Sequence, residues 1–302
     1  MSETLYRGMD RDEIDRQLNL RARWPEHQEY FERWARDSAA ARAQLDARLD
    51  LAYGASQGQT LDLFPAAAGS EPAPLLAFIH GGYWQSLDKG DFSYLAPAFV
   101  EAGIAFASPN YDLAPKVGVG EIVAQIRSAL VWLARHGPAH GVDPARIFVA
   151  GHSAGGQLAV MALVADWPAL AGHGVDKAGE AGEVPAEVVK GACTVSGVYE
   201  LEPLRLSYHQ EVLGLDAETV RTMSPLRRLP DRAGPLLCAV GSEETAEFLT
   251  QQDELVAAWR DRGLAVRVVE LPGRHHFSAV DALGDPRHRL FEAARALVLG
   301  EE

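Results

Sequence analysis

The sequence is poor in cysteine and lacks the motifs of metal or dinucleotide binding. Its only two cysteines, Cys193 and Cys238, lie in apolar stretches without a second ligand cluster beside them. We therefore interpret both as small core residues rather than as redox or metal ligands. No H-E-x-x-H motif occurs, and the G-x-G in "KVGVGEIV" lacks a third glycine and follows a loop. We expect no metal and no other cofactor.

Long apolar runs and basic clusters are also missing. No segment approaches the roughly 20 apolar residues that a membrane-spanning helix needs, and the charged start "MSETLYRGMDRDEIDRQLNL" has no signal-peptide core. The formal charge is −14, which argues against a nucleic-acid partner because phosphate backbones are negative. The sequence predicts a cytoplasmic protein with a small-molecule substrate and no membrane partner. It leaves the oligomeric state open, with a homodimer as one candidate.

Beyond about residue 50, apolar strand-like runs alternate with amphipathic helical patterns. The apolar runs lie at 74–80, 104–110, 146–151, 189–197, 235–241 and 265–271. The clearest helical patterns between them lie at 121–136, 156–167 and 246–263. Continuous apolar strands that alternate with helices predict an α/β fold with a mostly parallel sheet and helices on both faces.

Three stretches fall outside this alternation. We predict that residues 1–49, rich in Arg, Glu, Asp and Ala, form a helical extension that packs on a domain spanning 50–302. The insertion at 199–234 would lie over the C-terminal edge of the sheet, where ligands bind in open α/β folds, and is a candidate small cap. The small and polar segment 171–185 predicts a mobile loop.

The most informative motif is "GHSAG", residues 151–155, between an apolar strand and an Ala- and Leu-rich helix. In this context G-x-S-x-G forms a tight turn that holds a serine oxygen out above the sheet. The turn leaves little room for neighbouring side chains, which explains Gly151 and Gly155. The helix that follows points its first N–H groups at the same place. We therefore predict Ser153 as a nucleophile rather than an ordinary turn serine.

An earlier apolar run ends abruptly in "IHGGYW", residues 79–84. A carbonyl attacked by serine becomes an oxyanion, which needs donors beyond the N–H that follows the nucleophile. Two glycines let the loop turn its N–H groups toward the substrate with no Cβ in the way. We predict the backbone N–H groups of Gly82, Tyr83 and Ala154 as the donors, the alternative being a turn before two core aromatics. The ring of Tyr83 or Trp84 is also a candidate wall of an acyl pocket.

The base and the acid should follow the serine in the chain, the acid before the histidine. "RHHF", after the last predicted strand, offers His275 and His276. We choose His276, directly before Phe277, and interpret His275 as its neighbour on the loop. Because His80 and His152 belong to the two loops already assigned, we expect structural roles for them.

The acid is expected after "PLLCAVG", where both Glu243 and Glu244 qualify by position. A carboxylate there would orient the imidazole and stabilise its charged form. The residues alone leave the choice between the two open.

With these residues placed, the chain from "LDLFP" to the C-terminus resembles the kynurenine formamidase (arylformamidase) branch of the α/β-hydrolases, near the hormone-sensitive-lipase-like esterases. The motifs that carry the resemblance are "HGGYW", "NYDLAP", "GHSAGG", "GSEETAEF" and "RHHF". In that family the acid stands four residues before a Phe, as Glu244 does before Phe248. The resemblance therefore implies Glu244, where better-known members carry Asp. We also predict Trp84 and Tyr111, the latter in "NYDLAP", as substrate-pocket residues.

The resemblance implies an α/β-hydrolase fold and a serine hydrolase that cleaves an aryl formamide such as N-formylkynurenine through a formyl-enzyme. The alternative is a carboxylesterase that uses the same Ser-His-Glu triad on small acyl esters. Because formyl is the smallest acyl group, a tight acyl pocket would favour the first function and an open pocket the second. A non-catalytic binding protein would need a broken triad position, and the sequence has none.

Overall fold

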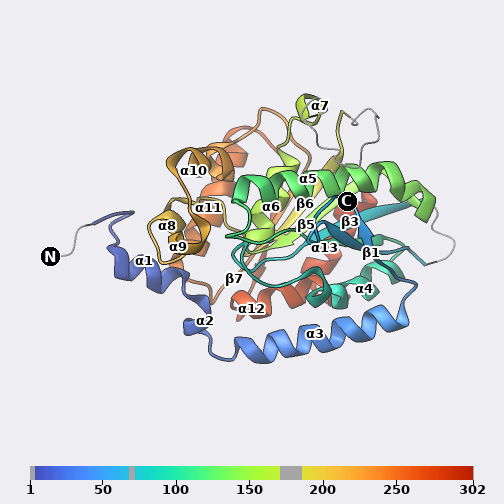
Figure 1. Ribbon diagram of the computed structural model, residues 1–302, viewed down its shortest axis with the longest axis horizontal. Coiled ribbons are helices and arrows are strands. Elements are labelled where there is room, and N and C mark those ends of the chain that lie inside the picture. The colour runs from blue at the N-terminus through green and yellow to red at the C-terminus, as the bar shows by residue number, and fades with distance from the viewer. Residues whose placement is uncertain (1–3, 68–71, 171–185, 302) are drawn as a thin grey trace.

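The computed structural model describes residues 4–67, 72–170 and 186–301. This part of the chain contains an eight-stranded sheet with the strand order β1-β2-β4-β3-β5-β6-β7-β8 (Figure 1). The strands are β1 (Arg48–Ala52), β2 (Thr60–Phe64), β3 (Ala73–Ile79), β4 (Ala105–Pro109), β5 (Val142–His152), β6 (Val189–Val195), β7 (Leu236–Gly241) and β8 (Val266–Leu271). Strand β2 is antiparallel to β1 and β4, and every other pairing is parallel. The predicted mostly parallel sheet is confirmed.

Helices cover both faces of this sheet. The α-helices in the described part of the chain are α1 (Arg11–Leu18), α2 (Leu20–Arg23), α3 (His27–Gln44), α4 (Ala96–Glu101), α5 (Val119–His136), α6 (Ala154–Leu163), α7 (Trp167–Leu170), α8 (Glu202–Arg205), α9 (Gln210–Leu213), α10 (Ala217–Met223), α11 (Ala246–Asp261), α12 (His276–Ala279) and α13 (Arg289–Leu299). Helices α5 and α6 lie on one face, and α4 and α13 lie on the other (Figure 1). None of the described helices combines the length and the apolarity that a bilayer crossing requires.

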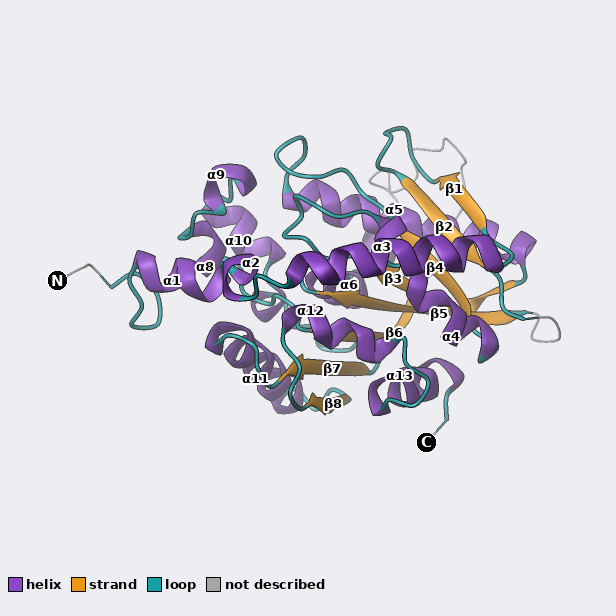
Figure 2. Ribbon diagram, turned by 90° about the horizontal axis from the view of Figure 1, so that it is seen from below, coloured by secondary structure: helices purple, strands orange, loops and turns teal. Residues whose placement is uncertain are grey.

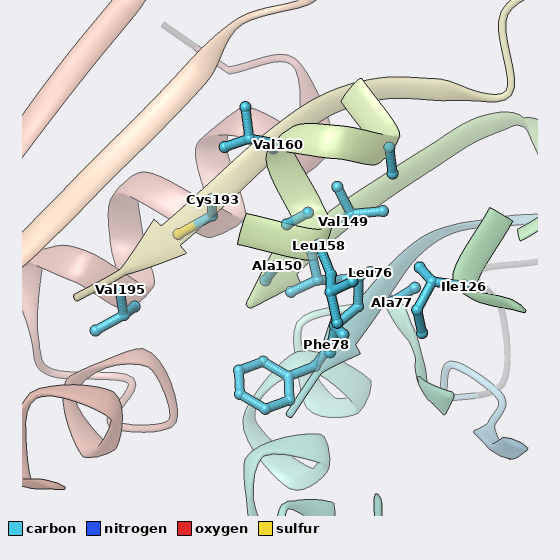
Figure 3. Close-up of a cluster of buried hydrophobic side chains, with 14 of the residues drawn as sticks. Leu76, Ala77, Phe78, Ile126, Val149, Ala150, Leu158, Val160, Cys193 and Val195 are labelled. Carbon is cyan, nitrogen blue, oxygen red and sulfur yellow. The ribbon is translucent and has the colours of Figure 1, made fainter. Parts of the chain in front are cut away.

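The central strands are buried on both faces, which explains their continuous apolar sequence. Every residue of β3 is buried. Ala77 lies in register with Val149 of β5, whereas Phe78 points away from Val149 to the other face of the sheet (Figure 3), where its ring centroid lies 5.3 Å from that of Phe92. A strand with one wet face would have to alternate apolar and polar residues, whereas a parallel strand between two helix layers does not. The continuous apolar runs in the sequence therefore identified these strands correctly.

Both cysteines are core residues, as predicted. Cys193 on β6 and Cys238 on β7 are fully buried and not disulfide-bonded. Burial raises the pKa of both thiols, that of Cys238 to about 12. Each thiol therefore stays protonated at neutral pH and packs as a small apolar group.

Helices α1 to α3 make up the segment before β1, which we call the N-terminal extension. Seen from below, α3 runs across the front of the sheet (Figure 2). It is anchored by Trp34, which is buried and whose Nε1–H donates to Oδ1 of Asp281 over 2.9 Å. Arg33 reaches the other carboxylate oxygen of Asp281 at 2.6 Å. Strand β1 begins at Arg48, and the division of the chain at residue 49 stays a prediction.

The insertion at 199–234 contains the short helices α8, α9 and α10, which lie beside α1 (Figure 1). Its polar groups are tied back to the core, since Nε2–H of Gln251 on α11 donates to the Glu200 carbonyl oxygen at 3.1 Å. The predicted loop at 171–185 lies outside the described residues.

Candidate active site

Ser153 stands at the turn between β5 and α6 in a strained backbone conformation. Its φ of 58° and ψ of −121° lie in a region that L-residues rarely adopt. Two glycines make the turn possible, because a Cβ at Gly151 would lie 2.0 Å from the Gly155 carbonyl oxygen. A Cβ at Gly155 would lie 2.0 Å from the carbonyl oxygen of Ile79. The tight turn that the motif predicts is present.

We expect Gly155→Ala to lower the free energy of unfolding by about 2 kcal/mol or more, because a methyl group would be forced against the β3 backbone. Urea denaturation would measure the change. Gly120→Ala is the matched control, since its Cβ would meet only the Met223 methyl group at 3.7 Å. That helical substitution should leave stability unchanged or raise it by up to about 1 kcal/mol. Equal stability of both variants would contradict the packing argument.

His276 and Glu244 form a buried pair at the ends of the last two strands. Nδ1 of His276, at the start of α12, lies 2.8 Å from Oε1 of Glu244, which follows β7. Because a carboxylate only accepts, Nδ1 carries the proton and Nε2 is left free to accept one. Phe248 packs against the imidazole with its ring centroid 4.9 Å away. Glu243 is exposed to solvent, so the geometry favours Glu244 as the partner of His276.

The remaining histidines near the site hold the loops in place. Nε2–H of His152 donates to the carbonyl oxygen of His276 over 2.9 Å. Burial, and to a lesser extent the neighbouring His276, lowers the pKa of His152 well below its usual range, so it stays neutral. His80 is buried and stacks on Tyr111 at 4.2 Å. His275 is partly buried against the N-terminal extension, where its ring stacks on Trp24 with centroids 5.3 Å apart.

The glycine loop after β3 packs directly against the serine turn. A Cβ on Gly81 would lie 2.7 Å from the His152 carbonyl oxygen and 3.0 Å from Cβ of Ser153. Gly82 and Tyr83 follow with φ of 104° and 51°. Among the described residues, no backbone carbonyl accepts a hydrogen bond from the N–H of Gly82, Tyr83 or Ala154. These three N–H groups, which the sequence predicts as oxyanion donors, therefore have no backbone acceptor in the described part of the chain.

A narrow cavity of about 30 Å³ opens beside these groups. One wall of this cavity is formed by Ser153, His276, Gly82 and Tyr83. The opposite wall comes from the N-terminal extension and includes Leu20, Arg21, Phe31 and Trp34. The sequence did not predict this wall. The sequence indicated only that residues 1–49 are helical and pack on the domain, and nothing in it singled out α2 or α3 as part of the site.

Two predicted pocket residues lie elsewhere. Trp84 is fully buried, and its Nε1–H donates to Oε1 of Gln157 on α6 over 3.2 Å. The hydroxyl of Tyr111 is also buried and donates to the His80 carbonyl oxygen at 2.9 Å. Neither lines the cavity beside Ser153, because both rings are turned into the core beneath the glycine loop. Of the two loop aromatics, it is Tyr83 that borders the cavity.

A second, larger cavity of about 510 Å³ lies next to the first. The two share three wall residues, Leu20, Arg21 and Tyr83. The insertion contributes Tyr208, His209 and Val212 to the second cavity, and the His209 ring lies 4.0 Å from the Tyr83 ring. The insertion therefore borders the cavity next to the one that contains Ser153, and its role as a cap stays a prediction.

The strand order with β2 antiparallel, together with a serine at the turn after β5, is the arrangement of the α/β-hydrolases. The protein is a serine hydrolase of this class. Residues 61–244 match the family model described as BD-FAE. The chain belongs to that family and to the kynurenine formamidase-like branch of the α/β-hydrolases.

The proteins similar to this chain include kynurenine formamidases and esterases. The kynurenine formamidase of Danio rerio is 30% identical over 256 residues, which cover 83% of this chain and 81% of that protein. Esterase LipQ of Mycobacterium tuberculosis is 29% identical over 83% of this chain and 61% of its own length. The solved structure of a proposed thioesterase from Silicibacter sp. TM1040 superimposes with a TM-score of 0.78 at 30% identity, covering 95% of this chain and 99% of that one.

Proposed function

We propose that the protein hydrolyses an aryl formamide, N-formylkynurenine being the type substrate, to the aryl amine and formate. The observation that carries this proposal is the cavity of about 30 Å³ beside Ser153. One water needs about 10–15 Å³ of such space, so this cavity has room for a formyl group, whereas a longer acyl chain would have to displace its walls. The similarity to a kynurenine formamidase supports the same substrate class.

In the proposed mechanism Ser153 Oγ attacks the formyl carbon while Nε2 of His276 takes the hydroxyl proton. The carbonyl oxygen becomes an oxyanion, which accepts hydrogen bonds from backbone N–H groups of Gly82, Tyr83 and Ala154. Glu244 stabilises the imidazolium without taking its proton. His276 then protonates the amine nitrogen, the C–N bond breaks, and the aryl amine leaves a formyl ester on Ser153.

Deformylation of the enzyme repeats these steps with water. His276 removes a proton from the water that attacks the formyl ester, and the same donors hold the second oxyanion. The proton then returns to Ser153 Oγ as the ester bond breaks and formate leaves. The aryl amine is proposed to occupy the larger cavity, whose walls include the rings of Tyr83, Tyr208 and His209.

The alternative function is a carboxylesterase that uses the same groups on small acyl esters. It is favoured by the similarity to esterase LipQ and by the structural likeness to a proposed thioesterase. A cytoplasmic location and a homodimer stay predictions from the sequence.

A side-by-side assay separates the two functions. We expect kcat/KM on N-formyl-L-kynurenine near 10⁵ M⁻¹s⁻¹, roughly the usual value for a natural substrate, and well above the values on p-nitrophenyl acetate and butyrate. The narrow cavity should also make acetate a better substrate than butyrate. Turnover of the esters with little deformylation would reject the formamidase function in favour of the esterase. A Ser153→Ala preparation purified in parallel controls for contaminating hydrolases.

A further inference from the structure

We propose that Arg21 binds a carboxylate on the amine side of the substrate, so that the enzyme selects aryl formamides that bear a carboxylate. This inference rests on the proposed function and adds a specificity-determining residue to the same site. The residue comes from α2, in the N-terminal extension, which contains none of the hydrolase motifs.

Arg21 occupies the wall that the two cavities share. A substrate whose formyl group enters the narrow cavity and whose aryl group fills the larger one must therefore pass this side chain. Its Nη2–H donates to Oγ of Ser86 over 2.9 Å, and its guanidinium carbon lies 5.4 Å from the centre of the Phe31 ring. Both contacts are with neutral groups. They orient the guanidinium at the shared wall but do not neutralise its charge.

The charge of Arg21 is not balanced by a carboxylate at either cavity. No Asp or Glu lines the two cavities, and among the described residues Arg21 makes no ion pair within 4 Å, unlike Arg11, Arg16 and Arg33. Asp15 approaches from α1, but it accepts the Tyr208 N–H at 2.9 Å and pairs with Arg11. An unpaired cation beside the substrate space stands out in a chain whose net charge is −14.

Arg21 is the only permanent positive charge among the residues that line these two cavities. The nearby His209 is no substitute, because burial lowers its pKa to about 4 and it is neutral at pH 7. Guanidinium groups carry several N–H donors in a planar fork that matches the two oxygens of a carboxylate. The ligand chemistry that fits this wall is therefore an aryl amine that bears a carboxylate, as an aromatic amino acid does.

The test compares N-formyl-L-kynurenine with its carboxamide, which keeps the formamide, the ring and the α-amino group but has a neutral amide in place of the carboxylate. In Arg21→Gln we expect KM for the acid to rise roughly 10- to 100-fold, the loss typical of a charge-assisted hydrogen bond, while kcat changes little. The value of kcat/KM for the carboxamide should stay within about 3-fold. The matched control is Arg23→Gln, an exposed arginine of the same helix that lines neither cavity. It should leave both substrates unaffected.

Equal losses on the acid and the carboxamide in Arg21→Gln would overturn the inference, because they would mean that Arg21 only supports the cavity wall. The same holds if wild-type protein does not distinguish the two substrates.

A pair of esters separates this inference from the proposed function. Wild-type protein and Arg21→Gln are also assayed on 4-acetoxybenzoate and 4-acetoxybenzamide, whose leaving groups differ in the same charge. Protein that cleaves these esters but no formamide rejects the formamidase function. A preference for the benzoate that disappears in Arg21→Gln would then still support carboxylate binding, and no preference would reject it.

Discussion

Ser153→Ala is expected to lower kcat on formamides and esters alike by roughly 10⁴-fold or more, as loss of a serine nucleophile does in related mechanisms. Without Oγ no covalent formyl-enzyme can form, and His276 has only water to activate. Ser153 is almost completely buried, and its backbone is already in the strained conformation that the variant would keep. The variant should therefore fold, and steady-state kinetics on N-formyl-L-kynurenine would measure the loss.

A matched control for this variant is Ser196→Ala. Ser196 is also a buried serine with positive φ, here 48°, at the end of the neighbouring strand β6, but it does not line the cavity beside Ser153. Its turnover should stay within about 3-fold of wild type, since a buried hydroxyl that touches no reacting atom affects mainly stability. Mass spectrometry after p-nitrophenyl acetate should find an acetyl group on the peptide with Ser153 in both wild type and Ser196→Ala. Near-normal turnover of Ser153→Ala would reject Ser153 as the nucleophile.

The sequence predicted most strands because burial on both faces of a parallel sheet requires continuous apolar runs. It missed the start of β5, which extends back to Val142 through "DPAR". The side chains from Pro144 to Arg146 are exposed there, so hydrophobicity carries no signal for this part of the strand. Strand order and the antiparallel direction of β2 were not predicted either, because both depend on contacts between residues distant in the chain.

In the candidate active site, too, features set by the local sequence could be predicted, whereas features set by distant contacts could not. The turn around Ser153 could be predicted because its geometry excludes side chains at neighbouring positions, and that requirement is visible within five letters, "GHSAG". The cavity walls could not, because they depend on where distant elements dock. Trp84 was assigned to the pocket, but its indole bonds to Gln157, 73 positions away. Arg21 meets Ser86 across 65 positions, and no local spacing encodes either contact.

Glu244→Gln is expected to lower kcat by about 10⁴-fold, the loss seen when the buried carboxylate of a serine triad becomes an amide. The amide has nearly the same shape, so packing is preserved, but it cannot stabilise the imidazolium by charge. It can also present its NH₂ group to Nδ1, which would then accept rather than donate and leave the proton on Nε2. Steady-state kcat at pH 7 to 8 would measure the effect, with the urea midpoint as a check on folding.

Glu243→Gln is the matched control, because it makes the same chemical change one residue away on an exposed side chain. A solvated carboxylate that contacts no imidazole should change kcat by less than about 2-fold, since water screens its charge. Glu244→Asp adds a second test, because a carboxylate shortened by one methylene cannot keep the 2.8 Å contact with Nδ1 unless the loop shifts. We expect kcat of that variant to fall between wild type and Glu244→Gln. A large loss in Glu243→Gln with little effect in Glu244→Gln would move the role of the acid to Glu243, and its carboxylate would then have to turn inward during the reaction.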